Sequence, residues 1–143
     1  MFEMLFRLFI KLQIAVFRRT NGRRMAILKG MPVLLLNTVG RKSKKQRTTP
    51  VMYIRDGENY VITASNSGNE HAPGWFYNLQ STPRVTIEVP GKQLQVISSI
   101  VPSAEKTRLW SQLIAQAPFF DGYRKKTSRV IPMILLQPET NLK

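Results

Sequence analysis

The sequence predicts an α+β fold whose strands form an antiparallel sheet or a barrel. Short stretches rich in β-branched and aromatic residues follow one another, and turn signals rather than long helices separate most of them. Asp56-Gly57 and Pro90-Gly91 each favour a tight turn between two such stretches, which is typical of β-hairpins. A doubly wound βαβ fold would need a helix between successive strands. With 143 residues, we expect one domain of the antiparallel kind.

The expected elements follow in chain order. An N-terminal apolar helix ends at Asn21-Gly22, because asparagine and glycine commonly stop helices. Apolar or alternating patterns predict strands at residues 33–38, about 47–55, 59–65, 84–89, 92–101 and 130–137. Helical patterns predict helices at residues 75–81 and 103–116, the second with Ser103 as its N-cap, and a short helical or irregular segment at 117–129.

Basic residues dominate the first two fifths of the chain. The formal net charge is +14, and between Glu3 and Asp56 the sequence has 13 basic residues and no acidic one. This asymmetry indicates an anionic partner, which could be nucleic acid, anionic lipid or a polyanionic small molecule. No helix-turn-helix, zinc-finger, KH or RNP motif is visible, so we expect no specific nucleic-acid partner.

The composition excludes several kinds of chemistry. The sequence has no cysteine and a single histidine, His71. Disulfides, thiolate nucleophiles and Cys-ligated metals are therefore excluded, and so is any site with several histidine ligands. We expect no metal, and the absence of cysteine fits a cytoplasmic protein.

The first 17 residues have the pattern of one amphipathic helix. Thirteen of them are apolar, and Glu3, Arg7 and Lys11 form a narrow polar stripe. Such a helix is roughly 25 Å long, too short to span a hydrocarbon core of ~30 Å. Two interpretations remain open: the helix packs on protein, or it lies on an anionic membrane surface at the inner face of the cell membrane. Residues 1–24 form this segment, and residues 25–143 form the expected ligand-binding domain.

A cationic turn interrupts the strands in LLLNTVGRKSKKQRTTP, residues 34–50. Five cations follow Gly40 within seven residues, namely Arg41, Lys42, Lys44, Lys45 and Arg47. The backbone N–H groups and hydroxyl groups of such a turn, together with charge-assisted bonds, suit a small phosphorylated or polycarboxylate ligand. Taken alone, a solvated loop is the simpler interpretation.

A second unusual stretch is ASNSGNEHAPGWFYNLQSTP, residues 64–83. Small residues, beginning with Ala64 and Ser65, end the expected strand, where a flat ring could approach the backbone closely. Three consecutive aromatic residues follow from Trp75 at the start of a short helix. Ordinary helix packing is the alternative explanation for these aromatic residues.

Together with APFFDGYRKKTSRVIP, residues 117–132, these two stretches resemble the deazaflavin-dependent nitroreductase family. The match runs in order from about Val33 to Pro138, and the first 20 residues are similar to the family's variable N-terminal extension. The resemblance implies a split β-barrel of about six mainly antiparallel strands, related to FMN-binding flavoproteins, with flanking helices. It also implies an oxidoreductase that transfers a hydride from the reduced 8-hydroxy-5-deazaflavin coenzyme, coenzyme F(420), to a quinone, a nitroaromatic compound or an activated alkene.

The resemblance assigns roles to residues at the matching motif positions. The coenzyme carries a phosphodiester and an oligoglutamate tail, and the family's positions for these groups correspond to the cationic turn. The residues thereby implied in coenzyme binding are Arg41, Lys42, Ser43, Arg47, Thr48, Thr49, Pro50, Val51, Met52, Ala64, Ser65, Asn66, Gly74, Trp75, Phe76, Tyr77, Asn78 and Phe120. Ser65 is also the candidate hydrogen-bond donor to the acceptor, and Tyr123 is the candidate proton donor.

Two departures from the family pattern bear on these expectations. Lys44 stands where the family usually has glycine, and it is strained by roughly 1 kcal/mol if this position needs a positive φ. Ala117 and Phe120 stand where tyrosines are frequent, so the acceptor side loses hydroxyl groups. This favours an apolar acceptor, such as a membrane quinone, over a nitroimidazole. The alternatives are an FMN- or heme-binding split barrel and a non-catalytic basic protein that binds membranes or nucleic acid.

Overall fold

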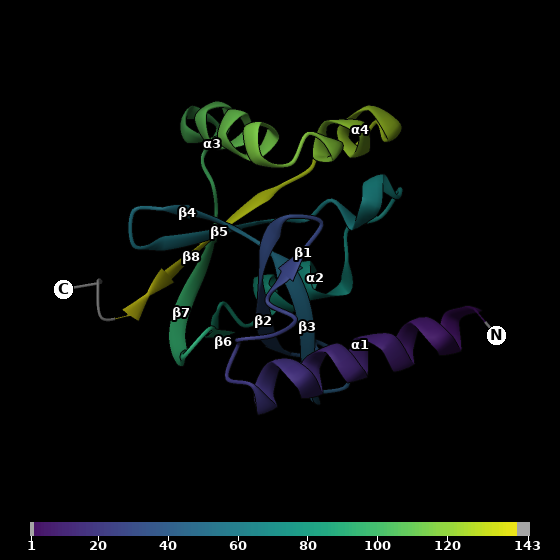
Figure 1. The fold of residues 1–143 in the computed structure, drawn as a ribbon. Coiled ribbons are helices and arrows are strands. Elements are labelled where there is room, and N and C mark those ends of the chain that lie inside the picture. The colour runs from purple at the N-terminus through teal and green to yellow at the C-terminus, as the bar shows by residue number, and fades with distance from the viewer. Residues whose placement is uncertain (1, 140–143) are drawn as a thin grey trace.

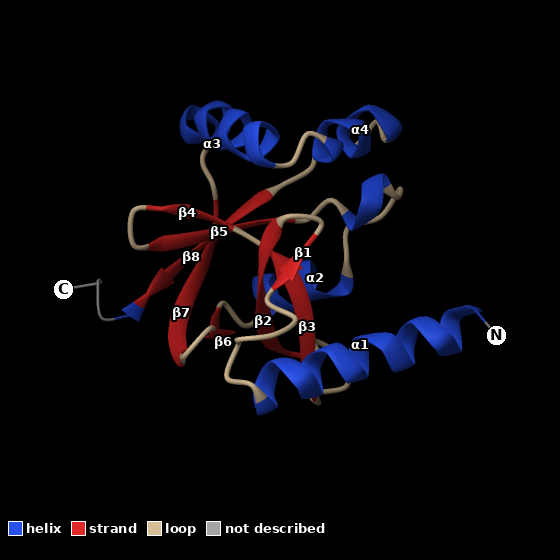
Figure 2. Cartoon of the chain, in the orientation of Figure 1, coloured by secondary structure: helices blue, strands red, loops and turns tan. Residues whose placement is uncertain are grey.

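A curled antiparallel sheet with helices on two sides forms the body of the protein (Figure 1; Figure 2). The computed structural model describes residues 2–139. Its helices are α1 (Phe2–Arg19), α2 (Gly74–Ser81), α3 (Ser103–Gln116) and α4 (Phe119–Lys126), with a short 3-10 turn at Asn66–Gly68. Its strands are β1 (Ile27–Leu28), β2 (Met31–Val39), β3 (Gln46–Met52), β4 (Ile54–Asp56), β5 (Asn59–Thr63), β6 (Arg84–Val89), β7 (Lys92–Ile100) and β8 (Met133–Pro138). Helices α3 and α4 lie at one end of the sheet, and α1 lies on the opposite side (Figure 1).

The strand pairings within residues 2–139 are all antiparallel. The hydrogen-bonded order is β1-β2-β6-β7-β8-β5-β4, and β3 pairs with β2. Strand β3 ends at Met52 and β4 begins at Ile54, so Tyr53 alone carries the chain from a strand on β2 to a strand on β5. The stretch 46–56 therefore joins two distant parts of the sheet. The expected α+β split barrel is confirmed, with eight strands where the sequence predicts about six.

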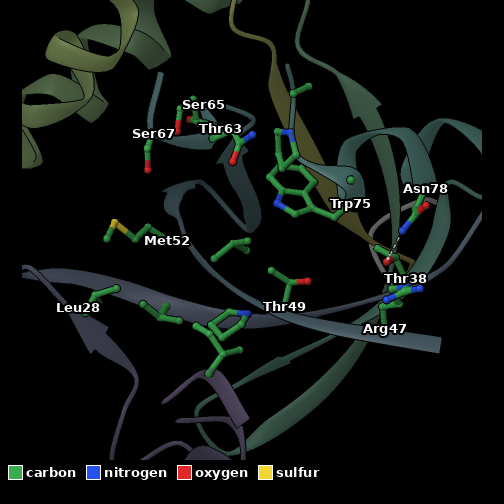
Figure 3. A pocket seen from close by; sticks show the side chains of 18 of the residues that line it. Leu28, Thr38, Arg47, Thr49, Met52, Thr63, Ser65, Ser67, Trp75 and Asn78 are labelled. Carbon is green, nitrogen blue, oxygen red and sulfur yellow. Dashed lines mark hydrogen bonds between the residues drawn. The ribbon is translucent and has the colours of Figure 1, made fainter. Parts of the chain in front are cut away.

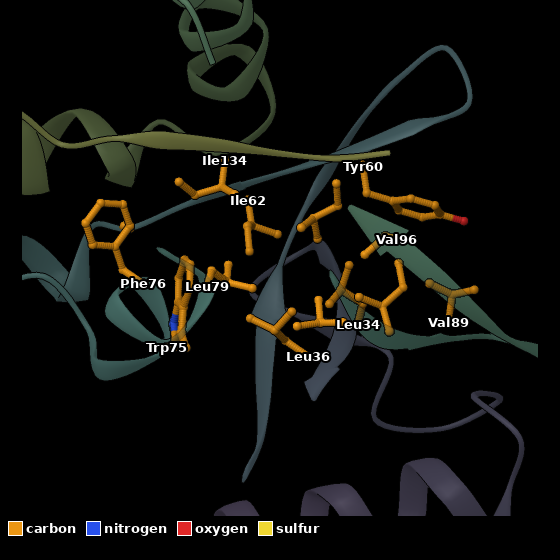
Figure 4. Packing of buried hydrophobic residues seen from close by; sticks show 14 residues of the cluster. Leu34, Leu36, Tyr60, Ile62, Trp75, Phe76, Leu79, Val89, Val96 and Ile134 are labelled. Carbon is orange, nitrogen blue, oxygen red and sulfur yellow. The ribbon is translucent and has the colours of Figure 1, made fainter. Parts of the chain in front are cut away.

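The core has two parts because alternate residues of a strand point to opposite faces. In the first part, Leu34 and Leu36 of β2 pack with Ile62 of β5 and with the aromatic side chains of α2 (Figure 4). In the second part, Val61 and Met133 pack under α3 and α4. This second part fixes α4 on the sheet, beside the 3-10 turn.

Most expected elements are confirmed, but several boundaries were wrong. The strand expected at 47–55 is two strands, because its halves pair with different partners. The third expected strand ends at Thr63 rather than at 65, and the last begins at Met133 rather than at 130. Pro102, not Ser103, occupies the N-cap position of α3, and no side chain caps this helix. Strand β1 lies outside every expected strand. Residue 1 of the expected helix and residues 140–143 of the domain lie outside the described residues.

Helix α1 ends where its sequence predicts. The Gly22 N–H donates to the Phe17 carbonyl oxygen at 2.8 Å, and Asn21 adopts a left-handed φ of 55°. This is the Schellman arrangement, which an asparagine or glycine makes possible. The helix contacts β3, and its side chains of Gln13 and Phe17 are buried. Within residues 2–139, no helix is both long and apolar enough to cross a membrane.

Candidate active site

A cavity of about 790 Å³ lies between α1, β3 and the loop that follows β5 (Figure 3). The β2–β3 turn, the start of α2 and helix α4 complete its wall. Figure 3 places Thr38, Arg47 and Asn78 together at one end, with Leu28 and Met52 at the other. The cavity thus has one polar, cationic end and one more apolar end, built from segments that are far apart in sequence.

The β2–β3 turn supplies the cations of the cavity. Arg41, Lys42 and Arg47 line it, and so does the hydroxyl-bearing Ser43. A Cβ atom on Gly40 would meet the Ser43 hydroxyl oxygen, which accepts a hydrogen bond from the Lys45 N–H at 3.2 Å, so a larger residue at position 40 would displace this hydroxyl group. The turn therefore gathers three positive charges in one part of the cavity wall.

Lys44 adopts a left-handed backbone conformation, which is unfavourable for lysine but not for the glycine that the family usually has at this position. Its φ is 62°, and its N–H donates to the Gly40 carbonyl oxygen at 2.9 Å. In this left-handed region a lysine is strained by roughly 1 kcal/mol, whereas a glycine is not. The position does need a positive φ, and the backbone bond within the turn maintains it.

Asn78 connects helix α2 to the cationic turn. Its side chain is 7% exposed; the Oδ1 atom accepts from the Arg41 N–H at 3.1 Å, and the Nδ2 group donates to the Thr38 hydroxyl at 3.2 Å. The Arg41 guanidinium lies over the Tyr77 ring, 4.9 Å from its centroid. Residues of α2 thus hold the backbone and the side chain of Arg41 in place.

The loop after β5 presents Ser65, Asn66 and Ser67 to the cavity. Asn66 and Ser67 both have positive φ, 47° and 56°, which is unusual for residues with side chains. The Arg129 guanidinium donates to carbonyl oxygens on both sides of this turn, those of Ser65 at 2.8 Å, Ala64 at 3.1 Å and Asn69 at 3.0 Å. Arg129, which the sequence did not single out, therefore fixes the loop that carries Ser65.

Helix α4 closes the cavity with aromatic side chains. Phe119, Phe120 and Tyr123 line it, with ring centroids 5.0–5.8 Å apart. The backbone of Tyr123 lies so close to Gly68 that a Cβ atom there would meet the Tyr123 carbonyl oxygen at 2.7 Å. The packing of α4 against this glycine sets the separation between Tyr123 and the Ser65 loop.

The structure gathers most of the expected site residues around this cavity. Those that line it are Arg41, Lys42, Ser43, Arg47, Thr49, Pro50, Val51, Met52, Ser65, Asn66, Gly74, Trp75, Asn78, Phe120 and Tyr123. Four others are placed elsewhere: Ala64 and Phe76 are buried in the core, Tyr77 packs against Arg41, and Thr48 bonds Asn37. Ala117 is buried under α3 and α4.

Sequence reasoning missed the contribution of α1. Phe6, Phe9, Ile10 and Gln13 line the cavity, and their spacing of i, i+3, i+4 and i+7 places them on one face of the helix. The signal that could have revealed it is this second stripe of the helix, which is separate from the polar stripe of Glu3, Arg7 and Lys11. Leu28 and Phe119 also line the cavity outside the expected set.

An ion pair attaches α1 to the sheet. The Arg18 guanidinium donates to Glu88 on β6 at 2.8 and 3.0 Å, and to the Thr48 hydroxyl on β3 at 3.2 Å. Asn37 also donates to Glu88, at 3.0 Å. The bond from Arg18 holds the pKa of the Glu88 carboxyl below its ordinary value, because it favours the ionised form. The Arg18–Glu88 pair thus links the cavity helix to two strands.

The cavity wall fits a polyanionic coenzyme with a flat ring. Of the described residues that line it, three are cationic and none is Asp or Glu. The cationic turn suits the phosphodiester and carboxylates of such a coenzyme, and the side chains of Trp75 and Phe120 offer apolar surface for a ring. A split barrel with a cavity of this kind suits the class of oxidoreductases that use a flavin-type coenzyme.

The particular family follows from comparison with known proteins. The chain belongs to the F(420)H(2)-dependent quinone reductase family, whose model matches residues 9–138. A quinone reductase of this name from Mycobacterium tuberculosis is 39% identical over 132 residues, covering 89% of this chain and 88% of the relative. A second relative from the same species, a quinone reductase of the same kind, is 34% identical over 110 residues. The family reaction is hydride transfer from reduced coenzyme F(420) to a quinone.

Solved structures agree with this assignment. An F(420)-H2-dependent reductase, FDR-A, matches with a TM-score of 0.68 and 28% identity, covering 74% of this chain and 94% of that one. A protein described as a domain-swapped dimer matches with a TM-score of 0.70 at 24% identity, which shows the shared fold. A heme storage protein of Vibrio cholerae, HutZ, has 20% identity and a TM-score of 0.53, so it too shows the fold alone.

Proposed function

We propose that the cavity holds the reduced coenzyme with its anionic tail on the cationic turn, and a membrane quinone against α1. The observation that carries this proposal is the division of the cavity wall. Three cations gather on the β2–β3 turn, whereas α1 contributes Phe6, Phe9 and Ile10. A polyanion and an apolar ring would each be drawn to a different part of one cavity.

In this proposal, the coenzyme supplies the hydride when it is bound. The protein's own task is to hold donor and acceptor at about 3–3.5 Å and to exclude water. The quinone takes up the hydride and one proton to give the quinol. Tyr123 gives this proton from its hydroxyl and regains one from solvent, while the Ser65 hydroxyl donates a hydrogen bond to the quinone oxygen that gains charge. Arg129 keeps Ser65 in place through its bonds to the loop backbone.

The outer face of α1 supports a membrane location for the acceptor. Met4, Leu5, Leu8 and Leu12 are 56–67% exposed and do not line the cavity. Arg19, Arg23 and Arg24 follow at its C-terminal end and are exposed. An apolar face flanked by arginines is typical of helices that lie on anionic membranes. In this proposal α1 touches lipid with one face and quinone with the other, and the protein is peripheral on the membrane.

Turnover of the full-length protein tests the reaction and the two roles. Reduced coenzyme F(420) and menadione should give quinol, and Ser65→Ala and Tyr123→Phe should each lower kcat/KM about 10- to 100-fold. Ser111→Ala, an exposed position on α3, is the matched control. Losses below twofold would contradict the assigned roles, and tight FMN binding without coenzyme F(420) binding would favour the alternative flavoprotein function.

Sedimentation with vesicles tests the membrane location. Wild-type protein should sediment with vesicles of phosphatidylglycerol and phosphatidylcholine, and the double variant Leu8→Gln/Leu12→Gln should not. Val130→Gln is the control, because Val130 is an exposed apolar residue between α4 and β8, at 79% exposure. Equal sedimentation of all three proteins would contradict the proposed role of this face.

A further inference from the structure

A nearly buried amide lies in the wall of the cavity. Gln13 of α1 is 2% exposed and lines the cavity. The side-chain hydrogen bonds within residues 2–139 do not include its amide. Trp110 Nε1 is the one fully enclosed side-chain polar atom in that range that lacks a partner, so the Gln13 amide must open onto the cavity.

This open amide needs a hydrogen-bond partner, which is water in the free protein and a bound molecule when one displaces that water. A molecule that displaced the water without offering a partner would leave the amide unpaired, at a cost of roughly 1–3 kcal/mol. The neighbours on the same helix face, Phe6, Phe9 and Ile10, are apolar and offer no partner. Gln13 is therefore the one polar side chain among the described residues that α1 contributes to the cavity, and it is available to a bound molecule.

We propose that Gln13 is an acceptor-binding residue, whose Nε2 group donates a hydrogen bond to a carbonyl oxygen of the quinone. A quinone is a flat apolar ring with two carbonyl oxygens, and it matches an apolar surface that carries one polar group. The coenzyme tail is drawn instead to the cationic turn. This inference rests on the proposed function, because it assumes that the acceptor lies against α1.

The bond has a consequence for catalysis as well as for binding. Negative charge grows on the carbonyl oxygen as the hydride arrives, so the bond from Gln13 strengthens on the way to the transition state. An acceptor without a hydrogen-bonding oxygen at this place would leave the amide unpaired and would be selected against. Gln13 therefore contributes to the preference for quinones.

Replacement of Gln13 by leucine tests the inference in the full-length protein. With reduced coenzyme and menadione, Gln13→Leu should lower kcat/KM about tenfold. The Kd of the coenzyme, followed by Trp75 fluorescence, should stay within twofold. The Tm without ligands should be unchanged or higher, because leucine adds apolar surface at a nearly buried position and removes no side-chain bond seen within residues 2–139. Gln116→Leu, at an exposed position at the end of α3, is the matched control and should change none of these values.

The outcomes separate this inference from the proposed function. Unchanged kcat/KM in Gln13→Leu, with a wild-type protein that reduces menadione, would overturn the role of Gln13 alone. An equal loss of coenzyme affinity, or a lowered Tm, would also overturn it, because the amide would then serve the coenzyme or the fold. A wild-type protein that reduces no quinone would overturn both.

Discussion

The cationic turn and helix α1 line the same cavity, yet they reach it in different ways. The turn is local: Gly40 and Lys44 close it by a backbone bond, and its cations are neighbours in sequence. Helix α1 comes from the N-terminal end of the chain, packs on β3 and is attached to the sheet by the Arg18–Glu88 pair. The comparison teaches that a binding site for charge can be encoded in one short segment. An apolar stretch can be recognised as a binding surface only when the segments that lie opposite it are known.

Removing the charge of the turn should have the largest effect. Arg41→Ala/Arg47→Ala should raise the coenzyme Kd about 100-fold, because two charge-assisted contacts are lost. The loss should shrink as ionic strength rises. Trp75 fluorescence measures the Kd, and Lys45→Ala, a cation of the same turn that does not line the cavity, is the control. If the double variant binds the coenzyme like wild type, the turn is not the tail site.

Freeing the Ser65 loop should have the next largest effect. Arg129→Met removes the bonds to four carbonyl oxygens, those of Ala64, Ser65, Asn69 and His71, and should lower kcat/KM about tenfold. In a Ser65→Ala background the same change should cost less than about twofold, because the positioned group is already absent. Arg129→Lys should recover part of the activity. Full additivity in steady-state assays would show that Arg129 does not act through Ser65.

A substitution in the α1 part of the cavity should weaken quinone binding and leave the affinity for the coenzyme unchanged. Phe9→Ser should raise the KM of a prenylated quinone about fivefold, since it removes apolar surface from the acceptor side. The coenzyme Kd should not change, which is the reverse of the result expected for the turn. Ala15→Ser, at an exposed position of α1, is the control in the same kinetic assay. A weakened coenzyme affinity would show that the two parts are not distinct.

The attachment of α1 should depend on pH. Glu88→Gln should lower the free energy of unfolding by about 1 kcal/mol at pH 7, where wild-type Glu88 is ionised and bonded to Arg18. The folded-state pKa of Glu88 is lowered from its ordinary 4.5, so this stability is present above pH 4.5 and is lost as the pH falls through the lowered value. Urea unfolding at several pH values should show the two proteins converging in acid. A constant difference would contradict the role of the pair.

Removing the backbone strain at Lys44 should have the smallest effect, on stability and on coenzyme affinity alike. Lys44→Gly releases roughly 1 kcal/mol of left-handed strain but adds freedom to the unfolded chain, so a net gain of about 0.5 kcal/mol is expected. The coenzyme Kd should change less than twofold, because Lys44 does not line the cavity. Thermal unfolding and fluorescence titration measure the two values. A large loss of affinity would show that lysine extends the anion site.

The cationic turn and the strands beside it show which features could be predicted from the sequence and which could not. The order of the expected elements and the turn itself could be predicted, because turn preferences and neighbouring charges act locally. The family pattern raised a positive φ at Lys44 only as a condition, and the structure shows that it is met. The split between β3 and β4 at Tyr53 could not, because one continuous strand pattern pairs with two different strands. The cavity roles of Gln13 and Arg129 depend on partners far away in the chain.

The sequence by itself determined the antiparallel α+β class, the cationic turn and, through its motifs, the family. These depend on local preferences and on charges that lie close together in the chain. Only the tertiary structure decided that α1 turns Phe6, Phe9 and Gln13 toward the cavity, and that Thr48, Phe76 and Tyr77 serve other contacts. The reason is that a helix with two apolar faces can bury either one, and the Arg18–Glu88 pair with the packing of Phe17 fixes which face meets the cavity.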